Sequence, residues 1–345
     1  MSVPYFLQRD PDPDFQEIEK VLKRKPSSRP VLFEFFMNDD VYSAATEELR
    51  LPEDERIRPA VKQVLAFWRL GYDYATLTTV PGYAFKTWEQ EAKTISLNSD
   101  PLVTDWKSFE TFKWPSLEDA DIDIIEEIEH YIPEGMKLIA SGPGGVEENV
   151  ISLTGYENLC YMMADDGKLA GAIFDEVGKR INSYYAEICK FDCIGAVISN
   201  DDWGFKTQTL LSEDQMEKYL YSWHLEITKT IHHSGCPAIL HSCGRLSPVM
   251  DIIIDDLQYD AKHSFEDEIQ PVEEAYEEYA HRIAILGGID LDFICQKTPE
   301  EVYRRSKAML ERTAGRGGYA LGTGNSVPNY VPRENYFAML QAARE

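Results

Sequence analysis

Short apolar, β-prone runs alternate along this chain with longer segments of helical periodicity. The apolar runs cover 31–36, 72–78, 136–141, 192–199, 237–242, 259–264, 282–289 and 317–323. Alternation of this kind is typical of parallel βα units. Eight units predict an α/β fold, a (β/α)8 TIM barrel. The alternative is a doubly wound open sheet, but no G-x-G-x-x-G motif follows the first run.

Helix signals and breaks in the pattern suggest how the chain is organised. Capping boxes predict one helix from Ser212 to about residue 232 and another from Thr298 to about residue 312. Residues 1–30 are expected to form an N-terminal helical extension, and 31–345 a single TIM-barrel domain. An aromatic insertion after the second run, 79–118, is expected near the active face. Its Trp106 and Trp114 are predicted to form a substrate wall, or else to anchor the insertion to the barrel.

Polar residues follow the apolar runs, and a barrel would gather these tips around one mouth. The most informative tip is His241-Ser242-Cys243-Gly244, at the end of a buried run. Residues two apart in a strand face the same way, so His241 and Cys243 are expected to converge. An imidazole and a thiol are ligands for a soft divalent ion, zinc first. The alternative is a buried cysteine beside a hydrogen-bonded histidine.

Charge and cysteine content exclude several classes of partner. The net charge of −26 is unsuited to nucleic acid or to an anionic membrane surface. The six cysteines include no C-x-x-C pair, and the first residues do not resemble a signal peptide. A reduced cytoplasmic location is the simplest interpretation.

The motifs of the C-terminal half carry a resemblance to a known family. HSCG at 241–244, HSFED at 263–267, GGID at 287–290 and G-x-G-N-x-x-x-x-Y-x-P-x-E-N-Y at 322–336 resemble the uroporphyrinogen decarboxylase superfamily. This superfamily includes decarboxylases and zinc- and cobalamin-dependent methyltransferases built on one barrel. Its decarboxylases resemble one another in an arginine-rich N-terminal segment, whereas residues 29–50 here are acidic and aromatic. The chain is therefore most similar to the corrinoid methyltransferase branch.

The methyltransferase resemblance implies a zinc site made by a His-x-Cys pair and a further cysteine in the last tip. His241 and Cys243 match the pair, but Thr323 stands where the further cysteine is expected. A third ligand would come from Glu266, His263, Asp202 or Asp290, and we expect Glu266. A site with one thiolate and harder ligands suits an oxygen-bearing donor.

The remaining candidates are assigned by their place in the predicted ring of tips. Asp201, Asp202 and Asp290 are predicted to be catalytic, by orienting the substrate or donating a proton. Trp106, Trp114, His263 and Asn325 are predicted to bind the substrate.

We expect a metal-assisted methyltransferase that moves a methyl group from a methoxyarene, methanol or a similar small donor to a corrinoid. The chain lacks a D-x-H-x-x-G motif, so cobalamin is expected on a partner protein. The expected partners are thus a small methyl donor and a corrinoid protein, and a homodimer is allowed for. The alternatives are decarboxylation of the uroporphyrinogen type and a catalytically inactive barrel with a binding role.

Overall fold

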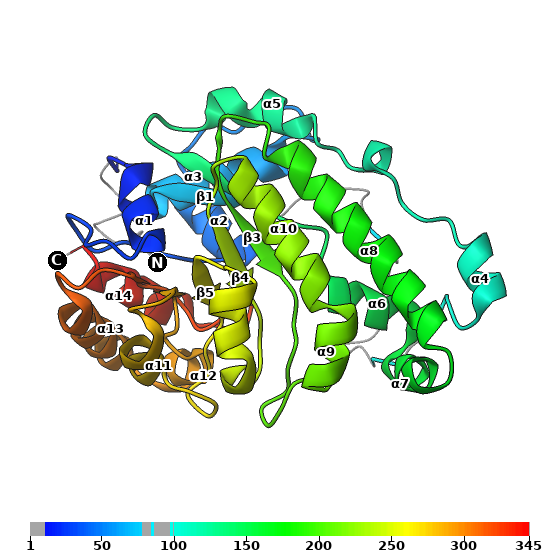
Figure 1. Cartoon of the computed structure of the whole chain (residues 1–345). Coiled ribbons are helices and arrows are strands. Elements are labelled where there is room, and N and C mark those ends of the chain that lie inside the picture. The colour runs from blue at the N-terminus through cyan, green and yellow to red at the C-terminus, as the bar shows by residue number, and fades with distance from the viewer. Residues whose placement is uncertain (1–10, 78–83, 86–96, 99, 345) are drawn as a thin grey trace.

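Seven parallel strands form one curled sheet in the computed structural model, which describes residues 11–77, 84–85, 97–98 and 100–344. The strands are β1 (Tyr74–Leu77), β2 (Lys137–Ser141), β3 (Ile194–Asn200), β4 (Ala238–His241), β5 (Ala261–His263), β6 (Ala284–Leu286) and β7 (Tyr319–Ala320). They are hydrogen-bonded in chain order, and Figure 1 shows helices packed around them. The predicted parallel α/β architecture is confirmed, and seven of the eight apolar runs supply these strands.

The first apolar run, 31–36, makes an isolated parallel bridge at Leu32 with Leu321, directly after β7. The Phe33 N–H donates to the Leu321 carbonyl at 2.7 Å. On the side of β1, a side chain makes the link instead of a backbone ladder. The Tyr74 hydroxyl accepts from the Glu34 N–H at 2.7 Å and lies 2.9 Å from the Glu34 carbonyl. The run therefore lies between the two ends of the sheet, although it is not one of its strands.

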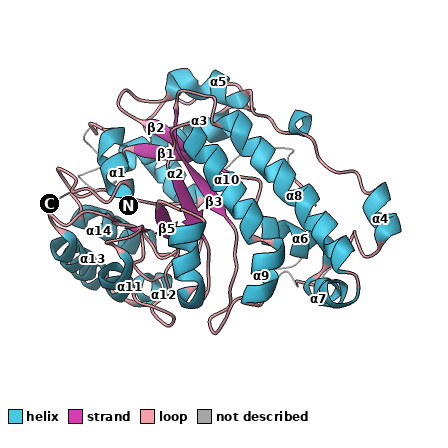
Figure 2. Ribbon diagram, viewed as in Figure 1, coloured by secondary structure: helices cyan, strands magenta, loops and turns pink. Residues whose placement is uncertain are grey.

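Helices cover the sheet on its outer side (Figure 2). They are α1 (Phe15–Leu22), α2 (Asp39–Thr46), α3 (Arg58–Leu70), α4 (Trp106–Thr111), α5 (Ile124–Ile128), α6 (Val146–Thr154), α7 (Tyr156–Asp165), α8 (Gly167–Ile188), α9 (Glu213–Tyr219), α10 (Tyr221–His233), α11 (Val272–Tyr279), α12 (Leu291–Gln296), α13 (Pro299–Thr313) and α14 (Arg333–Ala342). Short helical turns cover Leu117–Asp119, Glu129–Tyr131, Ser247–Val249 and Ile252–Asp256. None of the helices in the described ranges is both long and apolar enough to cross a membrane.

The two helices predicted from capping boxes are present, with one difference. Thr298 and Glu301 form the box that begins α13, as expected. Ser212 and Gln215 also form their box, but the helix that it begins is divided at Leu220 into α9 and α10. The helical periodicity continues across the division, so the sequence pattern did not reveal it.

Helix α1 lies against the amino ends of the strands. The Phe15 N–H donates to the Gly135 carbonyl just before β2, at 2.8 Å. The Phe15 ring occupies the space beside Gly195 in β3, where an added Cβ would lie 2.2 Å from the ring. The opposite, carboxyl end of the sheet is left for the polar tips. The domain boundaries at 1–30 and 31–345 stay a prediction.

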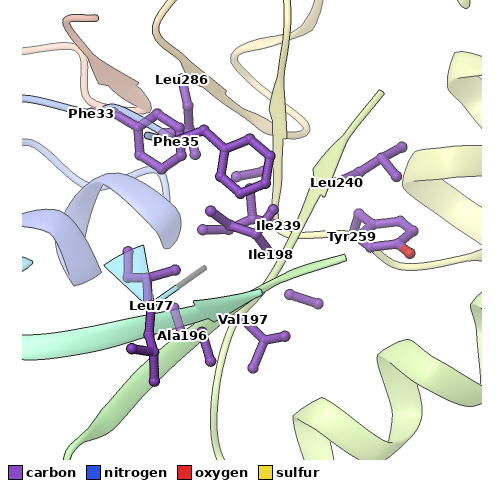
Figure 3. Close-up of a cluster of buried hydrophobic side chains, with 14 of the residues drawn as sticks. Phe33, Phe35, Leu77, Ala196, Val197, Ile198, Ile239, Leu240, Tyr259 and Leu286 are labelled. Carbon is purple, nitrogen blue, oxygen red and sulfur yellow. The ribbon is translucent and has the colours of Figure 1, made fainter. Parts of the chain in front are cut away.

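Apolar side chains fill the inside of the curled sheet (Figure 3). Ile198 and Ile239 are paired in register on neighbouring strands, so both face the same side. Phe33 and Phe35, from the first run, pack beside them, and all four side chains are buried. The interior of the curled sheet is therefore a packed core that supports the strand ends.

Candidate metal centre

The carboxyl ends of β3, β4 and β5 place three polar side chains in one row. Asn200, His241 and His263 are paired in register across these strands, so they share the inner face of the sheet. Cys243 follows His241 by two residues and Asp202 follows Asn200 by two residues, which keeps both near this face. The convergence of His241 and Cys243 expected from the H-x-C spacing is therefore present.

Asp202, His241 and Cys243 bring one oxygen, one nitrogen and one sulfur together, with all three ligand atoms within 4.8 Å of one another. The Cys243 Sγ lies 3.9 Å from the His241 Nε2. Sulfur and nitrogen bound to one tetrahedral zinc ion lie about 3.6 Å apart, so a small adjustment would seat the ion. The Cys243 N–H donates to the Asp202 Oδ1 at 2.8 Å, which orders the carboxylate beside the thiol. The three donors fit a divalent ion with an open fourth position.

The hydrogen bonds of His263 determine which nitrogen of His241 carries the proton. The His263 Nε2 lies 3.3 Å from the Thr323 carbonyl, which only accepts, so the His263 Nε2 must be an N–H. Burial lowers the pKa of His263 well below its usual value, so the ring is neutral and its Nδ1 is an acceptor. The two Nδ1 atoms of His263 and His241 are 2.8 Å apart, so the His241 Nδ1 is the donor. The His241 Nε2 lone pair is then left facing Cys243.

The sulfur of Cys243 receives two hydrogen bonds from neighbouring tips. The Asn325 Nδ2 donates at 3.1 Å and the Ser264 Oγ at 3.4 Å. Burial, together with the charge of Asp202, raises the pKa of the Cys243 thiol to about 12. A metal ion at this position would deprotonate the thiol, and the two donors would then stabilise the thiolate. Asn325, predicted to bind substrate, thus contacts the centre itself.

Thr323 occupies the position where the resemblance implies a third metal ligand, but its hydroxyl is already engaged. It donates to the Glu34 Oε1 at 2.9 Å, and both residues are fully buried. Burial raises the pKa of Glu34 to about 8, so this carboxyl is mostly protonated at neutral pH. The sequence pattern does not mark Glu34 as a site residue; its one signal is a glutamate inside the apolar run VLFEFF.

Asp201, predicted to be catalytic, faces away from the centre. Its carboxylate accepts the backbone N–H groups of Glu147 at 2.9 Å and Glu148 at 3.0 Å, at the start of α6. Its Oδ2 also lies 2.9 Å from the His224 Nε2, and both side chains are fully buried. Alternate residues of an extended chain face opposite sides, so Asp201 joins the helix layer while Asp202 reaches the centre. These contacts describe a helix-capping residue, and the catalytic role of Asp201 stays a prediction.

Two further predicted acids lie outside the cluster of three. Asp290 caps α12 by accepting the Phe293 N–H at 2.8 Å, and it also accepts the Asp267 N–H at 3.0 Å. These bonds account for its position without a catalytic role. Glu266, our expected third ligand, lines a neighbouring cavity instead of joining the cluster. Asp202, one of the alternative third ligands, joins His241 and Cys243 in the cluster instead.

Trp106, the first residue of α4, and Trp114, just after α4, pack against α8. The Trp106 indole donates to Asp166, the N-cap of α8, at 2.8 Å. The Arg180 guanidinium of α8 lies 5.1 Å from the centre of the Trp114 ring. Figure 1 shows α4 beyond α8, on the side opposite the sheet. These contacts favour the anchoring interpretation, and the substrate-wall role stays a prediction; residues 79–83, 86–96 and 99 of the insertion lie outside the described residues.

Comparisons with known proteins find one matching family and several similar solved structures. Residues 100–345 match the family described as Uroporphyrinogen decarboxylase (URO-D). A methyltransferase from Methanosarcina mazei aligns over 95% of this chain and 97% of its own, with 15% sequence identity and a TM-score of 0.72. A putative vitamin-B12 independent methionine synthase from Listeria monocytogenes aligns over 92% of this chain and 98% of its own, with 13% identity and a TM-score of 0.44. The search of curated proteins gives no match.

Proposed function

The chain belongs to the uroporphyrinogen decarboxylase family, and we propose that it is a metal-assisted methyltransferase that moves a methyl group from a small oxygen-bearing donor to a corrinoid on a partner protein. The observation that carries this proposal is the convergence of Asp202, His241 and Cys243 at one end of the sheet. The similarity in fold to a Methanosarcina methyltransferase supports it. Methoxyarenes and methanol are the donors that we consider first.

We also infer that the sheet is a (β/α)8 barrel in which the run 31–36 takes the first place. The bridge from Leu32 to Leu321 and the contacts of Tyr74 with Glu34 support this closure. In such a barrel the centre would lie at the face where barrel enzymes keep their chemistry.

Each residue of the centre would have a separate role in the reaction. A divalent ion held by Asp202, His241 and Cys243, zinc by this donor set, would supply Lewis-acid activation of the leaving oxygen. His263 would hold the His241 ring with its Nε2 lone pair free, as metal-bound histidines require. The Phe35 ring lies 4.6 Å from the His241 ring, centre to centre, and would exclude water from the inner side. The corrinoid of the partner protein would accept the methyl group.

Decarboxylation of a porphyrinogen is the alternative, and the placement of arginine argues against it. Arg29 pairs with Asp73 just before β1, at the amino end of the sheet. Arg50, at the other end of the same segment, is exposed on the surface. This segment therefore brings no cation to the centre for a substrate with many carboxylates, and the net charge of −26 would repel such a substrate.

Metal analysis of the purified protein tests the ligand set. We expect about one zinc ion per chain after reconstitution, with its loss in both Cys243→Ala and Asp202→Asn. Glu266→Gln is the matched control, because it removes a nearby carboxylate outside the cluster and should keep the ion. Full occupancy in Cys243→Ala would exclude this ligand set. A wild-type protein that binds no metal would favour the inactive barrel with a binding role.

A further inference from the structure

A second feature of the carboxyl end is a cavity beside the candidate centre. It has a volume of about 220 Å³ and lies between the loops that follow β4 and β5. Its polar lining includes Lys262, Arg245, Glu266 and Glu274. Ser264 connects the cavity with the centre, because it lines the cavity and its hydroxyl donates to the Cys243 Sγ at 3.4 Å. Ser264 also has a φ of +86°, a left-handed conformation that strains a non-glycine residue and is frequent at functional sites.

Lys262 is a buried cation without an acidic partner. Its residue is 4% exposed, and no carboxylate pairs with it anywhere in the described ranges. Its ammonium donates to the Ser264 carbonyl at 2.5 Å and more weakly to the Ser242 carbonyl at 3.5 Å. An ammonium has three N–H donors, so one is left over. Burial of a charge without an ion-pair partner is costly, and the Phe265 ring face below the Nζ and the more distant charges of Asp202 and Glu266 only partly offset this cost.

The residues that line the cavity indicate what kind of ligand would bring a negative charge to Lys262. Two cations and two carboxylates line the cavity, so a multiply charged anion such as phosphate would gain little from its net field. A ligand that places a single negative charge beside the Lys262 ammonium would be neutralised by that ammonium alone. Phe265, whose ring centre lies 4.2 Å from the Lys262 Nζ, and Ile269 add an apolar surface. The small volume excludes a large ligand.

We propose that this cavity binds the carboxylate of a small organic acid with an apolar body, and that Lys262 supplies the charge that recognises it. The identity of the acid rests on the proposed function: the acid is the methyl donor itself. The protein therefore prefers carboxylated aryl ethers to neutral aryl ethers as donors. The cavity would anchor the carboxylate, and the oxygen that carries the methyl group would extend past Ser264 toward Cys243.

Calorimetric titration of the purified protein with benzoate and with benzamide tests the cavity. The two probes share size and ring, and they differ in charge. We expect benzoate to bind the wild type at least roughly tenfold more tightly than benzamide, as one buried charge-assisted contact would give. Lys262→Met should remove this preference, whereas Lys229→Met, an exposed lysine of α10, should keep it.

A second variant tests the cavity independently, in case Lys262→Met loses benzoate binding through a folding defect. Ile269→Trp fills the cavity without touching the charge, and it should also abolish benzoate binding. Equal binding of benzoate and benzamide by the wild type would overturn the proposal, and so would unchanged benzoate binding in both cavity variants. Because the titration needs no methyl transfer, benzoate binding by a protein without transferase activity would contradict the proposed function and leave the cavity site in place.

Discussion

The protonation of His241 is determined by a residue that does not belong to the cluster of three. The Thr323 carbonyl orients His263, and the His263 Nδ1 in turn accepts a hydrogen bond from the His241 Nδ1. The H-x-C spacing predicted the convergence of His241 and Cys243, because strand alternation is a local property of the chain. The role of His263 depends on a contact between two strands. From the sequence, His263 is a candidate for substrate binding or for the third metal ligand.

Replacement of His263 tests this positioning role. In His263→Gln the His241 ring loses its fixed tautomer, so we expect zinc affinity to fall roughly tenfold to a hundredfold, as for other residues that orient metal-bound histidines. Competition with a chromophoric chelator measures the affinity directly. His233→Gln, at an exposed position at the end of α10, should leave it unchanged. Equal zinc affinity in the two variants would exclude the positioning role.

Glu34 gives a prediction for stability against pH. Its pKa is raised from 4.5 to about 8 by burial, so between these values the folded state holds a proton that the unfolded state releases. Stability should therefore decrease as pH rises from about 4.5 to about 8. Glu34→Gln stays neutral and should lose this decrease, so that the variant gains stability relative to the wild type toward pH 8. Urea unfolding across this pH range measures the free energy of unfolding, with the exposed Glu226→Gln as control. The same change of this free energy with pH in the wild type and in Glu34→Gln would contradict the raised pKa of Glu34.

At the scale of elements, the strands and capping boxes follow from local patterns, but neighbouring acids are harder to assign. Asp201 and Asp202 look alike in the sequence because both directly follow β3. Only the structure shows that one caps α6 and the other reaches Cys243. The contacts of Trp106 and Trp114 with α8 are unpredicted for a similar reason, since the pattern shows that an insertion is aromatic but not which helix it packs against.

Replacement of the two aspartates by alanine should therefore affect two different properties, the stability of the fold for Asp201 and zinc binding for Asp202. Asp201→Ala removes the acceptor of two N–H groups of α6 and the partner of His224, so we expect a loss of about 3 kcal/mol in the free energy of unfolding. Zinc content at low temperature should remain. Asp202→Ala should lose zinc and change the free energy of unfolding of the metal-free protein by less than about 1 kcal/mol. Denaturant unfolding and metal analysis of both variants separate the roles, and the reverse pattern would contradict them.

At the scale of the whole molecule, the run 31–36 links the two ends of the sheet. The run 31–36 was predicted as a strand from its composition, yet it forms only one bridge beyond β7. Toward β1, the Tyr74 hydroxyl takes the place of a ladder. A tyrosine that substitutes for backbone pairing has no signature in a single sequence, so this link was not predictable.

Tyr74→Phe tests this link between the ends of the sheet. The change leaves the buried N–H and carbonyl of Glu34 without their partner, and we expect a loss of about 2 kcal/mol in the free energy of unfolding. Tyr161→Phe is the matched control, because Tyr161 is 62% exposed. Equal denaturation midpoints for the two variants would show that the hydroxyl does not hold the ends together.

The most direct test of the central claim is the formation of methylcobalamin from cob(I)alamin, followed by absorbance, with methoxyarenes, methoxybenzoates and methanol as donors. We expect zinc-loaded wild type to catalyse the transfer from at least one of these donors. Cys243→Ala should lose at least roughly a thousandfold in rate, because the group that activates the leaving oxygen goes with the metal. Trp106→Ala, changed on the outer side of α8, should keep the wild-type rate. Conversion of uroporphyrinogen by the wild type at an enzymatic rate, without methylcobalamin from any of these donors, would contradict the account.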